Sequence, residues 1–404
     1  MSNFTLNVET EKSSGKVHLV PEGRIDSSTV TIFSNAVIAF CKEHHLMKEI
    51  IFDCRGLQYI SSAGLRVLLS IKKKENVSIK LINVSAEVDD IFEVTGFSQL
   101  FEVSKGIRDI SNIELQMMGK IGGMTLYRMP DGNLLKLYSA GTEYETVEKE
   151  LQYTRTAFMS GVPVLISYET VMCRNRYGII YEMPLAKTVS AMIGFQREKF
   201  NYYASEMGKT LKLIHSCKPQ EGILPKISGL YENYVSKMKD YLHDYEVEKL
   251  KAIVKSIPEA PTIVYGNYHS GNVFVQNDEL ILINMSGAGT GNPLYDLART
   301  YLIYVLEAEW LSQRLTGLDK IQSRMFWNVM IRSYLETDDE KAVKRAEGII
   351  HVAALLHSAL MPVMGDVSQE NTERLIANAK RDLFPIFDVA VQLFSGSDFL
   401  ITER

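Results

Sequence analysis

The sequence predicts an N-terminal α/β domain, with a mixed sheet and helices packed on it, followed by an α+β domain of two lobes. Through residue 110, short apolar strands alternate with amphipathic helices, which is typical of a sheet with helical connections. Near residue 117 a second pattern begins with strands joined by an Asp-Gly turn, and after residue 184 the chain is mainly helical. A chain of 404 residues is long enough for two or three domains. We therefore predict domains over residues 1–110 and 111–404, the second with a small lobe over about 114–183 and a helical lobe over about 184–404.

The elements of the first domain follow from residue type and spacing. Its predicted strands are runs of apolar residues, and its helices carry apolar residues three or four positions apart behind a serine that can cap the first turn. The expected elements are a strand over 17–20, a turn over 23–26, a helix through Ile32 and Cys41 capped by Ser27 or Ser28, a strand over 48–53, a loop over 55–60, a helix opening at residue 62 and ending at Lys74, a strand over 77–84, and a helix through Val88 and Val94 capped by Ser85.

Four short motifs in this domain carry a family resemblance through their order and spacing. They are GRID at residues 23–26, IFD at 51–53, YISSAGL at 59–65 and VTGF at 94–97. Over about residues 4–108 the chain thereby resembles a STAS domain, the fold of bacterial anti-sigma factor antagonists. The resemblance implies a regulatory protein whose partner at this domain is an anti-sigma factor or a serine kinase.

Ser62 is the candidate phosphorylation site that this resemblance implies. In the family, an Asp is followed by a serine that becomes phosphorylated; Ser61 takes the Asp position here and Ser62 the serine position, and Ser61 is an alternate acceptor. Backbone amides at a helix N-terminus accept a phosphate well, and its ~1.5–2 negative charges would disrupt a partner surface. Alternatively, Ser62 is an ordinary N-cap worth ~1 kcal/mol. Asp26 is expected to line the partner-binding face near the serine, or else to be a helix-start carboxylate favoured by the helix dipole.

In the second domain, one charged residue interrupts an apolar strand. The expected elements are strands over 124–129 and 133–138, a helix over 144–159 and a strand over 178–183. Lys136 lies in the second of these strands, where an unpaired ammonium would be costly, so a carboxylate partner is expected. Glu150 on the helix is the predicted partner. Glu148 is the nearby competitor, but it points about 200° around the helix.

The segment 263–298 carries a second resemblance. It reads YGNYHSGN at residues 265–272, INMSG at 283–287 and NPLYDLA at 292–298. It resembles the catalytic region of aminoglycoside and choline phosphotransferases, whose patterns are roughly H-G-D-x-H-x-x-N, I-D-F and D-P-x-Y-D-L-A. The resemblance implies a bilobal kinase-like fold that uses ATP or GTP. It also implies nucleotide contacts at Lys136, Glu150, Glu182 and Met183, catalytic-loop positions at Asn267 and His269, magnesium positions at Asn272 and Asn284, and a structural brace at Asp296.

Three acidic positions of that family are amides in this chain. Asn267 replaces the Asp that accepts the substrate proton, Asn284 replaces a magnesium-binding Asp, and Asn292 replaces the first Asp of the third motif; Tyr265 replaces the leading His. An amide brings no negative charge to a magnesium ion and cannot accept a proton near neutral pH. General-base help of ~10²–10⁴-fold would therefore be absent. The glycine-rich turn at 119–123 is a weaker signal, since such a hairpin is more often a plain turn than a phosphate cradle.

Composition places the chain among ordinary globular proteins. A formal net charge of −5 points to neither a nucleic-acid nor a membrane partner. The four cysteines form no C-x-x-C pair and are expected to be buried or free thiols in a reducing cytosol. The first residues lack the apolar run of a secretory signal, and the apolar segment 349–364 is too short to span a bilayer. We expect a cytoplasmic protein.

Two functions are consistent with these patterns. The first is a regulatory STAS switch at Ser62 joined to a pseudokinase that binds a nucleotide or a small ligand. The second is an active phosphotransferase that transfers phosphate from ATP or GTP to a small hydroxylated compound, with residual magnesium binding through Asn272. Asn267 and Asn284 disfavour the second.

Overall fold

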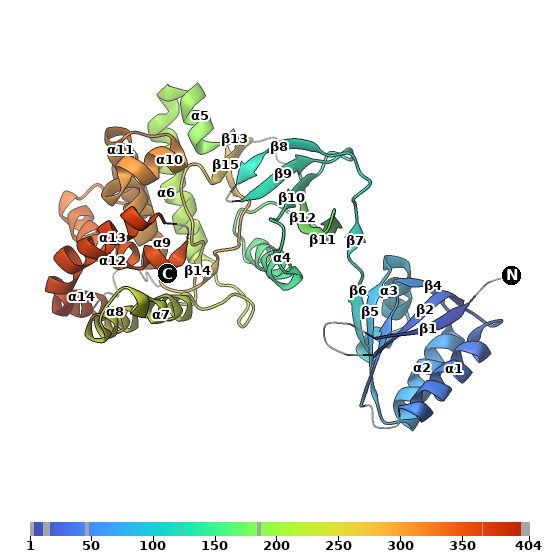
Figure 1. Ribbon diagram of the computed structural model, residues 1–404. Coiled ribbons are helices and arrows are strands. Elements are labelled where there is room, and N and C mark those ends of the chain that lie inside the picture. The colour runs from blue at the N-terminus through green and yellow to red at the C-terminus, as the bar shows by residue number, and fades with distance from the viewer. Residues whose placement is uncertain are drawn as a thin grey trace. The chain divides into compact units, whose positions relative to one another are not determined.

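The computed structural model describes residues 4–10, 17–44, 48–121, 123–183, 187–365 and 367–396. The chain divides into two compact units, Met1–Ile110 and Ser111–Arg404 (Figure 1). The first is an α/β unit and the second an α+β unit, so the predicted fold class is confirmed.

The first unit is a mixed sheet with helices on it. The strand order is β1-β2-β3-β5-β6, with β4 paired to β2; β1 is antiparallel to β2 and the other pairs are parallel. The helices α1 and α2 pack against each other beside the sheet (Figure 1). The elements are β1 Thr5–Thr10, β2 Val17–Ile25, α1 Val30–Glu43, β3 Glu49–Asp53, β4 Gly56–Ile60, α2 Ser62–Lys74, β5 Ser78–Val84, α3 Ala86–Val94, β6 Glu102–Lys105 and, at the end of the unit, β7 Arg108–Asp109.

Two predictions for this unit were wrong. The segment expected as a loop over 55–60 contains β4, which pairs with β2 so that Ile25 lies opposite Ile60. The segment expected as a turn over 23–26 continues β2 through Ile25, with a register shift between Gly23 and Arg24 where Gly23 has a φ of +87°. Both segments are short, and four or five residues are too few for alternation to separate a strand from a loop.

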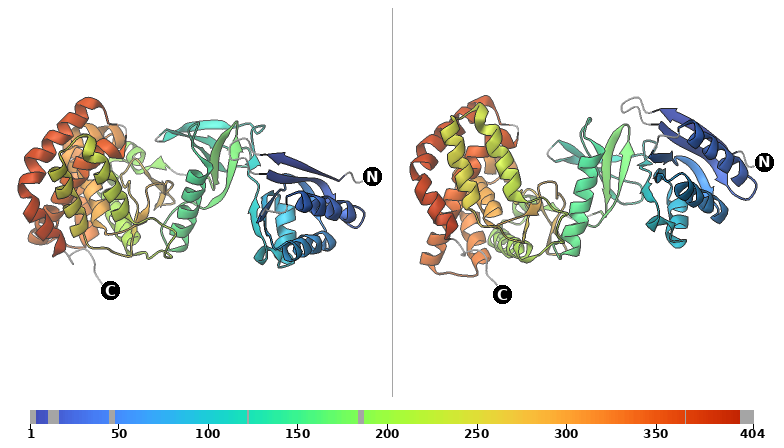
Figure 2. Two further views of the ribbon diagram at one scale, coloured as in Figure 1. Left: turned by 60° about the horizontal axis from the view of Figure 1, so that its bottom comes forward. Right: turned by 90° about the horizontal axis from the view of Figure 1, so that it is seen from below.

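The small lobe of the second unit is an antiparallel sheet with one helix against it. The strand order is β11-β12-β10-β9-β8, and α4 packs on β11 and β12. In Figure 2 the green helix of this lobe lies beside its strands. Val147 and Leu151 of α4 share a core with Leu134, Ile179 and other strand residues. The elements are β8 Gln116–Ile121, β9 Met124–Arg128, β10 Leu134–Leu137, α4 Tyr144–Met159, β11 Ser167–Cys173 and β12 Arg176–Tyr181.

The rest of the unit is mainly helical and has its own large core. Its elements are β13 Lys187–Thr188, α5 Val189–Phe195, α6 Phe200–Ser216, α7 Ile227–Lys237, α8 Asp244–Ser256, β14 Ile263–Val264, β15 Val273–Gln276, β16 Glu279–Leu282, β17 Gly289–Thr290, α9 Leu294–Tyr301, α10 Gln313–Thr316, α11 Lys320–Leu335, α12 Glu340–Met364, α13 Gln369–Asn378 and α14 Phe387–Ser395.

Within the described part of the chain, α12 is the one helix long and apolar enough to cross a membrane. However, 61% of its most apolar window is buried inside the lobe. A core helix explains this composition, as the sequence predicts for residues 349–364. All four cysteines are free and buried.

Two short strand pairs position the catalytic-type segment. The strand β14 pairs with β17, and β15 forms a hairpin with β16 through Asn277 and Asp278, both with positive φ as a tight two-residue turn requires. The loops that follow β14 and β16 are thereby brought together. Gly266 allows this approach: its φ is +82°, and a Cβ there would lie 2.2 Å from the carbonyl oxygen of Gly287.

Candidate functional site

Ser61 and Ser62 lie at the carboxyl end of β4, beside the carboxyl end of β2. The Ser61 N–H donates to the Ile25 carbonyl oxygen at 2.8 Å. The Ser61 hydroxyl accepts from the Gly64 N–H at 3.4 Å and caps α2, whereas Ser62 is the first helical residue and is exposed. The N-cap interpretation of Ser62 is therefore wrong, because Ser61 holds that position. Ser62 remains accessible at the start of the helix.

Asp26 follows β2 directly and lies at the same edge of the sheet. Its Oδ1 accepts from the Ser28 N–H at 3.0 Å and from the Ser28 hydroxyl at 2.6 Å. These two hydrogen bonds lower the pKa of Asp26, and the bond from the hydroxyl has the larger effect. The nearby Arg24 cation lowers it further. Ser28 thus binds Asp26 instead of capping α1, which begins at Val30. The structure places a carboxylate and an exposed serine after adjacent strand ends.

Lys136, on β10, is a buried cation of the small lobe. It is 3% exposed, and its Nζ lies 2.5 Å from Oε1 of the buried Glu150 on α4. The other Glu150 oxygen accepts a hydrogen bond from the Tyr138 hydroxyl. Burial lowers the pKa of Lys136, and the Glu150 carboxylate opposes that shift. The competitor Glu148 accepts from the Thr170 hydroxyl at 2.8 Å instead, so the pair expected from the sequence is present.

Glu182 and Met183 follow β12. The Glu182 N–H donates to the Ile166 carbonyl oxygen at 2.9 Å, and its Oε1 accepts from the Ile166 N–H at 2.9 Å. Met183 packs against the core of the small lobe. Residues 184–186, which continue this segment, lie outside the described residues, as does Gly122 in the glycine-rich hairpin. Nucleotide binding by Glu182 and Met183 stays a prediction.

Asn267 is the residue that the family resemblance aligns with the catalytic Asp. Arg299 on α9 donates two hydrogen bonds to its Oδ1, from Nε at 3.2 Å and from Nη2 at 2.9 Å. Only an oxygen can accept from both donors, which fixes the amide orientation and leaves Nδ2 on the other side. Asn267 therefore has no basic atom to offer a substrate hydroxyl, and its one acceptor is held by a guanidinium.

Asn284 is the residue that the resemblance aligns with the magnesium-binding Asp. Its Oδ1 accepts from Lys136 Nζ at 3.1 Å, from the Ser286 hydroxyl at 2.9 Å and from the Ser286 N–H at 3.3 Å. The atom that would face a magnesium ion is thus already in contact with a cation. Because an amide carries no charge to offset a divalent ion, this position is poorly suited to hold one.

Asn272 supplies the remaining predicted magnesium ligand. Its Nδ2 donates to the Tyr265 hydroxyl at 3.0 Å and to the Asn267 carbonyl oxygen at 3.2 Å, and its Oδ1 has no hydrogen bond with another described residue. No group of three or more His, Cys, Asp or Glu side chains among the described residues could hold a metal ion. One free amide oxygen without a carboxylate does not fit a magnesium site, so we derive no step through the metal.

His269 is buried beside this loop. It is 5% exposed, and its Nδ1 is buried with no hydrogen-bond partner among the described residues. Burial, together with the Arg299 cation, lowers its pKa to about 3. The ring is therefore neutral at physiological pH and offers no proton for acid catalysis.

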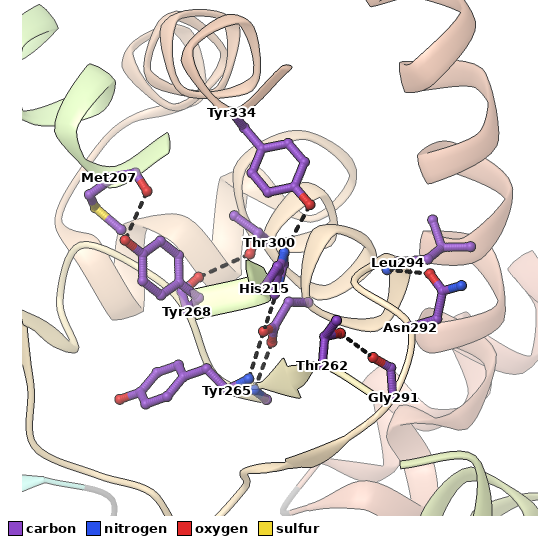
Figure 3. A network of polar contacts seen from close by, with 12 residues as sticks. Met207, His215, Thr262, Tyr265, Tyr268, Gly291, Asn292, Leu294, Thr300 and Tyr334 are labelled. Carbon is purple, nitrogen blue, oxygen red and sulfur yellow. Dashed lines mark hydrogen bonds and ion pairs between the residues drawn. The ribbon is translucent and has the colours of Figure 1, made fainter. Parts of the chain in front are cut away.

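Asp296 on α9 braces the catalytic-type loop, as the family resemblance implies. Its Oδ1 accepts from the Gly266 N–H at 2.6 Å, and its Oδ2 accepts from the Tyr265 N–H at 2.6 Å and from His215 Nε2 at 3.1 Å. A carboxylate only accepts, so Nε2 carries the proton and Nδ1 accepts from the Tyr334 hydroxyl at 2.9 Å (Figure 3). This network holds the backbone of the loop after β14 in place through the N–H groups of Tyr265 and Gly266.

The third amide, Asn292, has a structural use of its own. Its Oδ1 accepts from the Leu294 N–H at 3.0 Å (Figure 3), and its Nδ2 donates to the Pro258 carbonyl oxygen at 3.1 Å. A carboxylate could not donate the second bond. Asn292 therefore suits its local structure better than an Asp would.

Sequence reasoning missed Arg299 and its neighbours. Arg299 Nη1 lies 3.5 Å from His357 Nε2, and His357 Nδ1 lies 2.5 Å from the Tyr231 hydroxyl. Burial and the Arg299 cation hold the pKa of His357 well below its usual value, so that ring is neutral. The available signal was spacing: Arg299 follows Asp296 by three residues and shares its helix face.

Family comparisons agree with both resemblances. The family model "STAS domain" matches residues 7–110, and the model "Phosphotransferase enzyme family" matches residues 130–326. No curated protein matches the sequence.

Three solved structures illustrate the range of similarity. The streptomycin–ATP–APH(2'')-IIa ternary complex is 13% identical, with a TM-score of 0.46, covering 77% of this chain and 99% of that chain. A choline/ethanolamine kinase family protein from Mesorhizobium loti is 11% identical, with a TM-score of 0.46, covering 71% and 94%. An anti-sigma factor antagonist from Mycobacterium paratuberculosis is 19% identical, with a TM-score of 0.22, covering 25% and 86%. On the family matches, the chain contains a STAS domain followed by a kinase-like domain of the phosphotransferase enzyme family.

Proposed function

We propose that this chain is a bacterial regulatory protein in which an anti-sigma factor antagonist-like switch at Ser62 is joined to a pseudokinase. The pseudokinase binds a nucleotide or a small ligand without transferring phosphate efficiently. One observation carries this proposal: the two amides at the essential acidic positions are each engaged by a cation of the protein, Asn267 by Arg299 and Asn284 by Lys136. A site so arranged lacks the general base, worth ~10²–10⁴-fold, and the carboxylate that magnesium prefers.

Nucleotide binding is supported by the buried Lys136–Glu150 pair, which holds the lysine in a fixed position beside Asn284. With ATP or GTP in excess we expect the melting temperature to rise, because a ligand at 100 times its Kd stabilises the folded state by about 2.7 kcal/mol. The rise should need no magnesium. It should be lost in Lys136→Met and kept in Lys149→Met, a control at an exposed position of the same helix as Glu150.

The alternative is an ATP- or GTP-dependent phosphotransferase that acts on a small hydroxylated compound. An intact Lys136–Glu150 pair fits that function as well. The same samples discriminate between the two: steady turnover of nucleotide that Lys136→Met abolishes would favour the enzyme. No thermal shift at millimolar nucleotide would instead leave the domain as a scaffold or a sensor of another ligand.

The Ser62 switch is supported by the position of this residue. It is exposed at the first position of α2, near Asp26 on the adjacent strand end. Phosphate there would meet free helical amides and would add ~1.5–2 negative charges to a surface that already carries a carboxylate. Such a change alters the surface without requiring the helix to unfold.

For the switch, we expect protein purified from its own host to carry one phosphate on the peptide that contains Ser62, and none there in Ser62→Ala. Ser62→Asp should weaken capture of a candidate anti-sigma factor, while Ser62→Ala leaves it intact. An acidic residue at a helix N-terminus is favoured by ~0.3–1 kcal/mol, so loss of folding would not explain the result. Ser78→Asp, at the amino end of β5 and thus far from the carboxyl strand ends that Ser62 adjoins, is the charge control. Equal capture by Ser62→Asp and Ser62→Ala would rule the switch out.

A further inference from the structure

Two cavities in the helical lobe share the residues around Arg299. The larger one, of about 350 Å³, and the smaller one, of about 190 Å³, are both lined by Asn267, Arg299, His357 and Met364. The larger cavity also reaches Asn284 and Ser286 beside the lost magnesium position. It therefore adjoins the site at which a phosphotransferase would carry out its chemistry.

The charged side chains that line these cavities, among the residues that the structure describes, are cationic. No described Asp or Glu lines either cavity; Arg299 lines both, and Arg314 lines the smaller one. No carboxylate among the described residues lies within ion-pairing distance of Arg299, whose side-chain partners are the Asn267 amide and the neutral His357 ring. Burial lowers the pKa of Arg299, and Tyr231 and Asp296 oppose that shift without forming an ion pair with it.

The two amides at the lost acidic positions add hydrogen-bond donors to this wall. The oxygens of Asn267 and Asn284 accept from Arg299 and Lys136, so their NH₂ groups are the ends left over. Neither NH₂ group donates to another described residue. Where the family pattern has two carboxylates, this chain has two amides, which line the same cavity as Arg299.

The remaining wall is aromatic and aliphatic, with Ile227, Leu230 and Val264 beside three tyrosines. Tyr231, Tyr234 and Tyr295 line the larger cavity, and the rings of Tyr231 and Tyr295 are 4.5 Å apart between centroids. The Tyr295 hydroxyl is buried and has no hydrogen-bond partner among the described residues. An apolar wall with a few polar groups on the other side is typical of a small-molecule site.

We propose that the larger cavity binds a small organic anion, whose carboxylate or phosphate group is held by Arg299 and the amide NH₂ groups of Asn267 and Asn284. Guanidinium and amide N–H groups are the usual donors to such anions. A polycationic amine or choline would meet the Arg299 guanidinium there and would be repelled. This inference rests on the ligand-binding role proposed above and names the chemical class of the ligand.

Ser286 allows a comparison of a charged with a neutral side chain of the same size, both of which replace the hydroxyl that donates to Asn284 Oδ1. It is exposed and lines the cavity, so a side chain there can be exchanged without disturbing the core. Ser286→Asp adds a carboxylate to the cavity wall, and Ser286→Asn is its neutral isostere. The probes are inorganic phosphate, glycerol 3-phosphate and glutarate, with choline and spermidine as cations, titrated calorimetrically into the full chain at constant ionic strength.

At least one anion should bind while neither cation does. Its affinity should fall at least ~10-fold in Ser286→Asp and stay near the wild-type value in Ser286→Asn. Arg299→Gln should abolish binding, and Arg332→Gln, at a surface ion pair of the same lobe, should leave it unchanged. A comparison of the affinities for inorganic phosphate and glycerol 3-phosphate with the affinity for glutarate shows whether the site prefers a phosphate or a carboxylate group.

Two outcomes would overturn the inference: tighter binding of choline or spermidine than of every anion, or equal anion affinities in Ser286→Asp and Ser286→Asn. The nucleotide proposal fails separately. If ATP binds through Lys136 while Ser286→Asp and Ser286→Asn bind the anions equally well, the proposed anion site is wrong and nucleotide binding stands. If the anions bind more weakly to Ser286→Asp than to Ser286→Asn while ATP and GTP do not bind at all, the anion site stands and nucleotide binding is wrong.

Discussion

Lys136→Met is expected to destabilise the kinase-like domain by about 3–5 kcal/mol. The substitution removes the cation that lies 2.5 Å from Glu150 Oε1, and it leaves a carboxylate buried with one hydrogen bond, from the Tyr138 hydroxyl. An uncompensated buried charge costs far more than the pair contributes. Urea unfolding followed by tryptophan fluorescence measures the change, since Trp310 and Trp327 both lie in this domain.

A second substitution separates charge from packing. In Lys136→Met with Glu150→Gln, no buried charge remains, and most of the lost stability should return. Lys149→Met, one position before Glu150 and exposed, should change stability by less than ~0.5 kcal/mol. If the double variant were as unstable as Lys136→Met alone, the loss would come from packing and the buried ion pair would not explain it.

The features predicted correctly from sequence are those that depend on residue type and on spacing within a single helix or strand. A lysine inside an apolar strand requires a carboxylate, and the spacing along α4 favoured Glu150 over Glu148; the structure has that pair. The helix Tyr144–Met159 has the predicted bounds because its apolar positions repeat at helical spacing before Gly161. The absence of charge at Asn267 and Asn284 could likewise be inferred from residue identity alone.

What the sequence could not provide is the set of contacts that long-range packing decides. Asn267 and Arg299 are 32 positions apart, and their hydrogen bonds depend on how α9 is placed against the loop after β14. Residue identity says that Asn267 has lost a charge, but only the fold reveals that a guanidinium occupies its oxygen. In the first domain, β4 was missed for the same reason, because a five-residue strand is defined by its partner β2 more than by its own pattern.

These contacts decide what restoring the acids would do. Asn284→Asp is expected to make ATP binding depend on magnesium, because it adds the negative charge that the metal prefers, partly offset by Lys136 at 3.1 Å. Adding Asn267→Asp should still give little turnover. Arg299 would hold the new carboxylate through the same two N–H groups and lower its basicity.

The largest increase in the rate of ATP hydrolysis should therefore appear when Arg299→Gln is combined with Asn267→Asp and Asn284→Asp. The carboxylate at position 267 is then free to accept a proton, and we expect ATP hydrolysis at least ~10²-fold faster than in the double variant, at the low end of general-base effects. Phosphate release in single-turnover reactions measures this, and Lys136→Met in the triple background should remove it. If the double variant already matched the triple, Arg299 would not restrain this position, and the replacement of the acids alone would account for the low turnover that we propose for the native site. If neither variant released phosphate although ATP and magnesium bound, the defect would lie in positioning the acceptor, since phosphoryl transfer depends as much on geometry as on charge.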